Sequence, residues 1–152
     1  MPIRIIVIGK KHDTWIVEGV QRYEKRLKAP FKTEWVLLPH SAMSGDTARQ
    51  EESQRILSRL NANDYVILLD EKGKNIDSPE LSSKLLAQLE ASRPVVVIIG
   101  GAYGVDDTVT NKADFIWSLS KLVFPHQLVR LILAEQIYRA QEIANNKPYH
   151  HD

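Results

Sequence analysis

The chain has 152 residues, the size of one compact domain, and we expect residues 1–152 to form a single domain. Hydrophobic residues make up 43% and charged residues 26%, and 20 basic against 19 acidic side chains leave a net charge of +1, so a disordered chain and a strongly basic nucleic-acid coat are excluded. There is no cysteine, which excludes disulfides and thiolate metal sites. The apolar runs are too short to cross a bilayer and no signal-peptide pattern is present, so we expect a cytoplasmic protein.

The first third of the chain alternates between apolar runs and helical patterns. Ile3–Ile8 is mostly β-branched and apolar, which predicts a strand buried on both faces. A helix with an apolar stripe begins at Thr14 as its N-cap and is stopped by Pro30. Phe31–Leu38 is predicted to be the second strand, and Thr47–Leu60 a mostly polar second helix.

The middle of the chain repeats this alternation. Tyr65–Leu69 predicts a third buried strand, and Asp70–Asn75 is predicted to be a loop. A third helix begins at Ser78, with Pro79 at the first helical position. Pro94–Ile99 is the most apolar segment and is predicted to be the fourth strand.

The last third begins with a glycine-rich loop, Gly100–Gly104, which follows the fourth predicted strand. A short helix over Asp107–Asn111 and a brief strand over Phe115–Ser118 are predicted next. Leu119–Pro125 is irregular, and the last helix, predicted over His126–Ala144, is followed by a polar tail.

Alternating strands and helices favour a parallel sheet with helices on both faces. In such sheets ligands bind at the carboxyl ends of the strands, so the loops Asp70–Asn75, Gly100–Gly104 and Leu119–Pro125 form the predicted site. The last helix is apolar on more than one face and must be buried on more than one face. A second copy of the chain is the simplest partner, so we expect a homodimer.

The motifs in this region leave alternatives open. The glycine loop matches neither G-x-G-x-x-G nor a Walker motif, and is either a plain turn or a close approach to a ligand. His126, Arg130, Glu135 and Arg139 are either a solvated face with an ion pair or a polar stripe with a task.

The end of the chain and one basic cluster are also open to two interpretations. Tyr149–Asp152 is either a frayed end or an arm that reaches a partner's site, and its adjacent histidines supply few ligands, so we expect no metal. The basic cluster Arg22–Lys28 either contacts RNA phosphates or is a solvated helix end.

A series of segments spread over the whole chain resembles the ribosomal RNA large subunit methyltransferase H family, small members of the SPOUT superfamily. The segments are Val7–Lys10, Tyr23–Leu27, Val66–Asp70 with Gly73-Lys74, Val97–Gly104, Leu119–Lys121, Phe124–Arg130, Leu133–Ala140 and Pro148–His150. The Phe-Pro-His…Arg…Glu…Tyr-Arg series is specific, whereas the glycine loop alone is not.

The resemblance implies an α/β-knot fold with a C-terminal trefoil knot, an obligate homodimer, and S-adenosylmethionine-dependent N3-methylation of a pseudouridine in 23S rRNA of the assembled ribosome. The positions that match cofactor-contacting residues are Leu69, Gly100, Gly101, Gly104, Leu119, Ser120, Lys121, Leu122, Val123 and Phe124. Those that match the composite active site, which the tail of one subunit completes in the other, are His126, Arg130, Glu135, Arg139, Tyr149 and His150.

The sequence leaves open the proton acceptor, one RNA contact and the choice between an enzyme and a binding module. Either His126 or His150 is the proton acceptor. His151-Asp152 stands where the family often has a cation, which puts one RNA contact in doubt. The alternative to an enzyme is a non-catalytic ribosome- or RNA-binding module that retains the fold.

Overall fold

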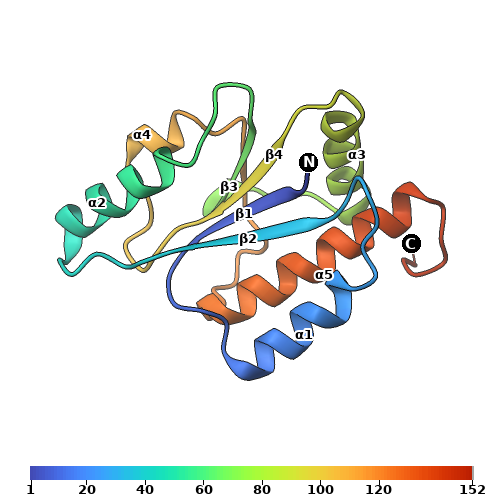
Figure 1. Ribbon diagram of the computed structural model, residues 1–152, viewed down its shortest axis with the longest axis horizontal. Coiled ribbons are helices and arrows are strands. Elements are labelled where there is room, and N and C mark those ends of the chain that lie inside the picture. The colour runs from blue at the N-terminus through green and yellow to red at the C-terminus, as the bar shows by residue number, and fades with distance from the viewer. Residues whose placement is uncertain (152) are drawn as a thin grey trace.

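A computed structural model describes residues 1–151 and contains one five-stranded sheet in the order β2-β1-β4-β3-β5, with every neighbouring pair parallel (Figure 1). The strands are β1 (Ile3–Ile8), β2 (Thr33–Leu38), β3 (Tyr65–Lys74), β4 (Val95–Ile99) and β5 (Phe115–Trp117). The helices are α1 (Thr14–Glu24), α2 (Gly45–Leu57), α3 (Ser78–Glu90), α4 (Asp107–Thr110) and α5 (His126–Ala144). The predicted parallel sheet flanked by helices is confirmed.

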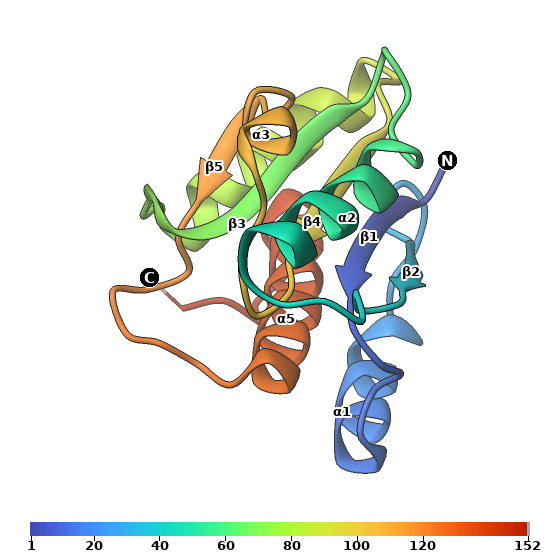
Figure 2. The ribbon, with the colours of Figure 1, turned by 90° about the vertical axis from the view of Figure 1, so that its left-hand side faces the viewer.

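Alternate residues of the central strands point to opposite faces of the sheet, and each face has its own hydrophobic cluster. Ile5 and Val97, which are paired across β1 and β4, belong to the cluster beneath α1, α3 and α5. Their neighbours Ile6 and Ile98 belong to the cluster that includes Ile56 of α2 and residues of α4. The sheet is therefore buried on both faces, as its apolar strands require (Figures 1 and 2).

The helix α5 has the predicted bounds and packs between α1 and α3 on one face of the sheet (Figure 1). Leu133 and Ile137 are buried in the cluster beneath these helices. Leu128 and Ile132 are half-buried and belong to none of the three hydrophobic clusters among the described residues. Part of the apolar surface of α5 is therefore left uncovered by its own chain.

The predicted loop Asp70–Asn75 is wrong, because β3 continues through it to Lys74. The strand β5 pairs with β3 on both sides of an irregularity, so that Trp117 lies opposite both Leu69 and Lys74. A Cβ at Gly73 would lie 2.6 Å from the carbonyl oxygen of Ile116. The glycine that suggested a loop is instead what allows the two backbones to approach.

The bounds of α1, β2 and α2 also differ from the predictions, and those of β4, α4 and β5 differ by one residue at one end. The N-cap of α1 is Asp13, not Thr14. The helix ends at Glu24, because the backbone between Glu24 and Pro30 forms tighter i→i+3 turns. The strand β2 starts at Thr33, since Phe31 is still part of a turn. The helix α2 runs from Gly45 to Leu57, and Leu60 lies in a following turn.

Candidate functional site

A cleft of about 900 Å³ lies at the carboxyl ends of β3, β4 and β5. One wall comes from residues 68–72 of β3, and a second from residues 99–107. A third comes from residues 117–124, of which 118 and 121 do not line the cleft. His126 and Val129 of α5 lie at one side. These walls come from the three segments that were predicted to form the site because they follow the carboxyl ends of strands, although the first of them is strand rather than loop. A volume of this size is typical of small-molecule and cofactor sites.

Nine of the ten residues expected to contact a cofactor line this cleft. They are Leu69, Gly100, Gly101, Gly104, Leu119, Ser120, Leu122, Val123 and Phe124. Lys121 is exposed and does not line it. The side chain of Ser120 accepts a hydrogen bond from the Leu122 amide at 3.0 Å, which shapes the turn around Lys121.

The glycine loop turns tightly at the edge of the cleft, with the Gly104 amide donating to the Gly101 carbonyl at 3.0 Å. Gly104 has a φ of +72°, a backbone conformation that side chains with a Cβ adopt only with strain. A Cβ at Gly104 would meet nothing within 4 Å, so the space beside this backbone is open. The loop therefore presents backbone polar groups that a ligand can approach closely.

His126, the first residue of α5, joins this helix to the glycine loop. Its Nε2 donates to the Gly100 carbonyl at 2.9 Å, which leaves Nδ1 as the acceptor of the neutral ring. Burial lowers the pKa of His126 below the ordinary 6.5, against the raising effect of the Gly100 carbonyl, and the charges of Arg130 and His40 lower this pKa further. At neutral pH the ring is a proton acceptor at the edge of the cleft.

Arg130, one turn further along α5, is buried and does not line the cleft. Its Nη1 donates to the Lys10 carbonyl at 2.8 Å and to Nδ1 of His12 at 3.2 Å, while its Nε has no hydrogen-bond partner among the described residues. Burial lowers the pKa of this guanidinium, and the charge of Asp13 opposes that effect. Arg130 thus fastens the loop after β1 to α5.

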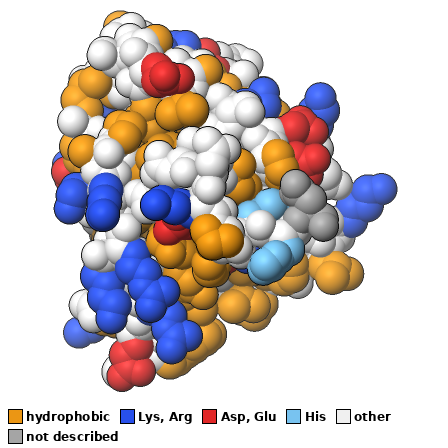
Figure 3. Space-filling model, turned by 90° about the vertical axis from the view of Figure 1, so that its right-hand side faces the viewer, with side chains coloured by type: hydrophobic (Ala, Val, Ile, Leu, Met, Phe, Trp, Pro, Cys, Tyr) orange, Lys and Arg blue, Asp and Glu red, His pale blue; other side chains and the backbone are white. Residues whose placement is uncertain are grey.

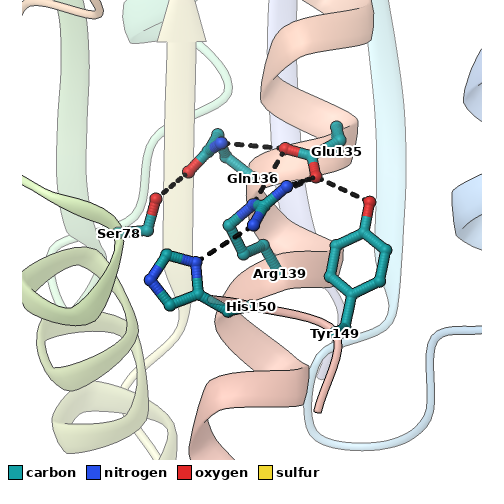
Figure 4. A network of polar contacts seen from close by, with 6 residues as sticks. All are labelled: Ser78, Glu135, Gln136, Arg139, Tyr149 and His150. Atoms are coloured by element: carbon teal, nitrogen blue, oxygen red, sulfur yellow. Dashed lines mark hydrogen bonds and ion pairs between the residues drawn. The ribbon is translucent and has the colours of Figure 1, made fainter. Parts of the chain in front are cut away.

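The second half of α5 carries an ion pair that the tail completes (Figure 4). Arg139 Nη2 donates to Glu135 Oε2 at 2.7 Å, and the Tyr149 hydroxyl donates to the same oxygen at 2.8 Å. The hydrogen bond to Glu135 raises the pKa of Arg139, and burial, followed by that carboxylate, raises the pKa of Tyr149. Arg139 is therefore held in its charged form, and Tyr149 in its neutral form.

The same network reaches α3 and the following histidine (Figure 4). Nδ1 of His150 accepts from Arg139 Nη1 at 3.0 Å, and Gln136 bridges Glu135 to the hydroxyl of Ser78. Arg139 lies thirteen residues after His126, about 20 Å along the helix axis. Within one chain the predicted active-site residues therefore lie in three places. His126 lies at the cleft, and Arg130 is buried. The other four, Glu135, Arg139, Tyr149 and His150, form what we call the tail network.

Sequence reasoning did not select several polar residues beside the cleft. Arg49 of α2 lines it, and Glu52 of the same helix is buried behind the glycine loop. His40 lies beside Gly9 together with Arg130 and His126, and His12 accepts a hydrogen bond from Arg130. The rule that ligands bind at the carboxyl ends of parallel strands was applied only to the three later loops, although His12 and His40 follow β1 and β2, which end at the same edge. No sequence motif marked Arg49 or Glu52, which lie on a helix.

Two negative findings apply to the described part of the chain. Within residues 1–151, no group of three or more His, Cys, Asp or Glu side chains is arranged to hold a metal ion. No helix in the same range is long and apolar enough to cross a membrane.

Comparison with known proteins assigns this fold and cleft to a family. A family model described as predicted SPOUT methyltransferase matches residues 1–150. Proteins named ribosomal RNA large subunit methyltransferase H from Methylobacillus flagellatus and Hydrogenovibrio crunogenus are 38% and 40% identical over 156 residues, with 100% of both chains covered. One from Dichelobacter nodosus is 40% identical over 154 residues, covering 99% of each chain.

A solved structure, of a probable methylase family protein from Haemophilus influenzae, superposes with a TM-score of 0.59 over 99% of this chain and 70% of that chain. At 14% identity this likeness concerns the fold alone. The full-length matches confirm the resemblance seen in the sequence. The chain belongs to the SPOUT methyltransferase family, and it is a methyl-transferring enzyme.

Proposed function

We propose that this protein transfers a methyl group from S-adenosylmethionine to N3 of a pseudouridine in 23S rRNA of the assembled ribosome. One observation carries the proposal: a chain that matches ribosomal RNA large subunit methyltransferases over its full length has a cofactor-sized cleft where a parallel sheet binds ligands. Ribosomes function in the cytoplasm, which is therefore the proposed location.

The cleft fits the proposed methyl donor. Apolar side chains of Leu69, Leu119 and Phe124 supply walls for an adenine ring, and the backbone between Gly100 and Gly104 supplies polar groups. The donor supplies an already activated methyl group, so the protein's contribution is mainly to hold and align the two reactants. We keep the ten predicted contact residues as the proposed binding set, with Lys121 as its outer member.

The acceptor nitrogen carries a proton and is a poor nucleophile until that proton leaves. We place the proton acceptor at Nδ1 of His126, because this ring lines the cleft and its lowered pKa keeps it neutral. Arg139 is proposed to favour the negative charge that develops on the base, and Glu135 to orient Arg139. Arg130 is buried away from the cleft, so its proposed role is to hold the loop after β1 beside His126 rather than to contact the base.

A homodimer brings the tail network to a cleft that one chain leaves open. Leu122 and Val123 are 71% and 81% exposed at the rim, and Leu128 and Ile132 of α5 are only partly covered. We propose that a second copy covers this surface and that its Tyr149 and His150 complete the site. The C-terminal trefoil knot and the single domain over residues 1–152 are part of the same proposal.

The docking of rRNA is proposed to use local positive charge, since the net charge is only +1. Lys and Arg side chains gather over the end of α1, at the lower left of Figure 3, beside an apolar area. The exposed cations at this end of α1 are Arg22, Lys25, Arg26 and Lys28.

The test is incubation of ribosomes that lack this modification with labelled S-adenosylmethionine, followed by nucleoside mapping of 23S rRNA. We expect label in one pseudouridine, and calorimetry shows donor binding by the protein alone. Gly104→Val is the matched inactive variant, because a β-branched side chain is strained at the φ of +72° of this cleft-lining residue, so the substitution is expected to distort the loop. Ribosome binding without transfer establishes the non-catalytic module instead, and no donor binding at millimolar concentration overturns the proposal.

A further inference from the structure

The inward face of α2 is unusually polar for a helix that packs on a sheet. Its buried residues are Ala48, Glu52, Ser53 and Ile56, and only Ile56 belongs to a hydrophobic cluster. Burying a carboxylate and a hydroxyl is costly unless each group has a partner. The groups that contact these polar side chains therefore indicate the structural role of α2.

Two hydrogen bonds from α2 reach the extended glycine loop, residues 100–106, which includes the two residues that follow Gly104. The hydroxyl of Ser53, which is fully buried, accepts a hydrogen bond from the Asp106 amide at 2.9 Å. Arg49, one turn earlier, donates from Nε to the Tyr103 carbonyl at 2.8 Å and is itself paired with Asp46. The helix thus holds one amide and one carbonyl of the loop.

Glu52 makes the third contact. Its side chain is 3% exposed, and its Oε2 accepts from the Ser41 amide at 2.9 Å. Its Oε1 has no hydrogen-bond partner among the described residues and would lie 2.7 Å from a Cβ at Gly101. The carboxylate therefore packs directly against the backbone of Gly101, and a Cβ at this position would force the carboxylate to move.

These three contacts meet the loop at residues 101, 103 and 106, and all of these loop residues line the cleft. A glycine-rich segment loses more conformational entropy on ordering than other segments do. A ligand that must order such a loop binds more weakly than one that finds it ordered. Contacts that hold the loop in advance therefore strengthen ligand binding at the cleft.

We propose that Arg49, Glu52 and Ser53 are positioning residues that hold the glycine loop in the conformation that binds the methyl donor. The inference rests on the proposed function for the identity of that ligand. Glu52 and Ser53 act only through the loop, because neither lines the cleft.

The first test is Ser53→Ala, which removes the acceptor of the Asp106 amide. We expect the dissociation constant and the KM for S-adenosylmethionine to rise about tenfold, with kcat at saturating donor and the KM for ribosomes within twofold of wild type. Ser58→Ala, at the exposed end of the same helix, is the matched control. Unchanged donor affinity in Ser53→Ala, or an equal loss in Ser58→Ala, overturns the proposal.

The second test uses the contact between Glu52 and Gly101. Gly101→Ala is expected to weaken donor binding more than tenfold, and adding Glu52→Ala to recover at least half of that loss on a logarithmic scale, because the carboxylate that meets the new methyl group is gone. Glu51→Ala, on the exposed side of α2, is not expected to rescue Gly101→Ala. If Gly101→Ala is equally harmful with and without Glu52, this contact does not position the loop.

Hydrogen exchange separates a failure of this inference from a failure of the proposed function. The amides of residues 101–106 are expected to exchange at least fivefold faster in Ser53→Ala than in wild type, whether or not the wild-type protein binds S-adenosylmethionine. Absence of donor binding by wild type overturns the function alone. Equal exchange rates in the two proteins overturn the positioning role.

Discussion

Arg130 carries its guanidinium into the interior, where the side chain is 1% exposed. Its hydrogen bonds go to the Lys10 carbonyl and the His12 ring rather than to a carboxylate. A buried charge with only neutral partners contributes little net stability compared with an apolar side chain of similar volume. What this residue contributes is the position of the loop between β1 and α1.

Replacement of Arg130 separates packing from charge. We expect Arg130→Ala to lower the free energy of unfolding by about 3 kcal/mol, because it leaves a cavity under the loop. Arg130→Met refills that space and is expected to recover most of the loss. Urea denaturation measures both variants, with the exposed Arg22→Ala as control. Equal destabilisation by Ala and Met contradicts this and assigns the loss to the polar contacts.

Two half-buried histidines near Arg130, His12 and His126, make stability depend on pH. Burial, and secondarily Arg130, lowers the pKa of His12, and burial lowers the pKa of His126. Between the ordinary 6.5 and these lowered values the unfolded chain binds more protons than the folded one, so stability falls as the pH falls through that window.

His12→Gln removes one of these groups and keeps a hydrogen-bond acceptor for Arg130. Urea denaturation at pH 7.5 and 5.5 is expected to show a smaller loss of stability on acidification in His12→Gln than in wild type. The exposed His151→Gln is the control and keeps the wild-type loss. An unchanged pH dependence in His12→Gln rules out this histidine as its source.

At the scale of elements, the two halves of the continuous helix α5 make different contacts. Its first turn closes the cleft through His126, whereas its second half holds the tail through Glu135 and Arg139. Tyr149 packs against the second half of α5, with its ring 4.8 Å from that of Tyr138 and its hydroxyl on Glu135. The tail is therefore anchored at its aromatic residue rather than frayed.

Arg139→Ala tests the second half of α5. The guanidinium lies over the Tyr149 ring and bonds Glu135 and His150, so its loss releases the tail. We expect methyl transfer to fall at least tenfold, the free energy of unfolding by about 1 kcal/mol, and donor affinity to stay the same. Lys147→Ala, exposed beside the tail, is the control. Normal transfer by Arg139→Ala removes this residue from the active site.

At the scale of the whole molecule, the apolar surface around the cleft rim is the surface on which the proposed homodimer depends. Leu122 and Val123 are among the most exposed large apolar side chains, and they adjoin the incompletely covered first half of α5. Exposed apolar area of this kind is typical of a protein interface. This exposed apolar area is therefore the reason for proposing that a second copy covers this surface.

Val123→Asp places a charge in the middle of that surface. Light scattering of the wild-type protein is expected to give twice the chain mass of 17.3 kDa, and Val123→Asp to dissociate to the single chain, because an unpaired buried charge is costly. Met43→Asp, at another exposed apolar residue elsewhere on the surface, is the control and is expected to stay dimeric. A single-chain mass for wild type contradicts the proposed homodimer.

Much of this architecture follows from local patterns. The strands β1 and β4 and the helix α5 are predictable because apolar periodicity and chain breakers act over a few residues. The extension of β3 was not predictable, because it depends on pairing with Trp117, more than forty residues away. Gly73 is compatible with a loop and with a close strand contact alike.

The sequence alone determined the order of strands and helices, and hence the sheet edge at which the cleft lies, since hydrophobic periodicity is a local property. Only the tertiary structure decided which polar groups meet: that Arg130 is buried against His12, that Glu52 packs behind Gly101, and that Tyr149 returns to α5. The physical reason is that such contacts join residues far apart in the chain. Their geometry depends on how whole helices pack on the sheet.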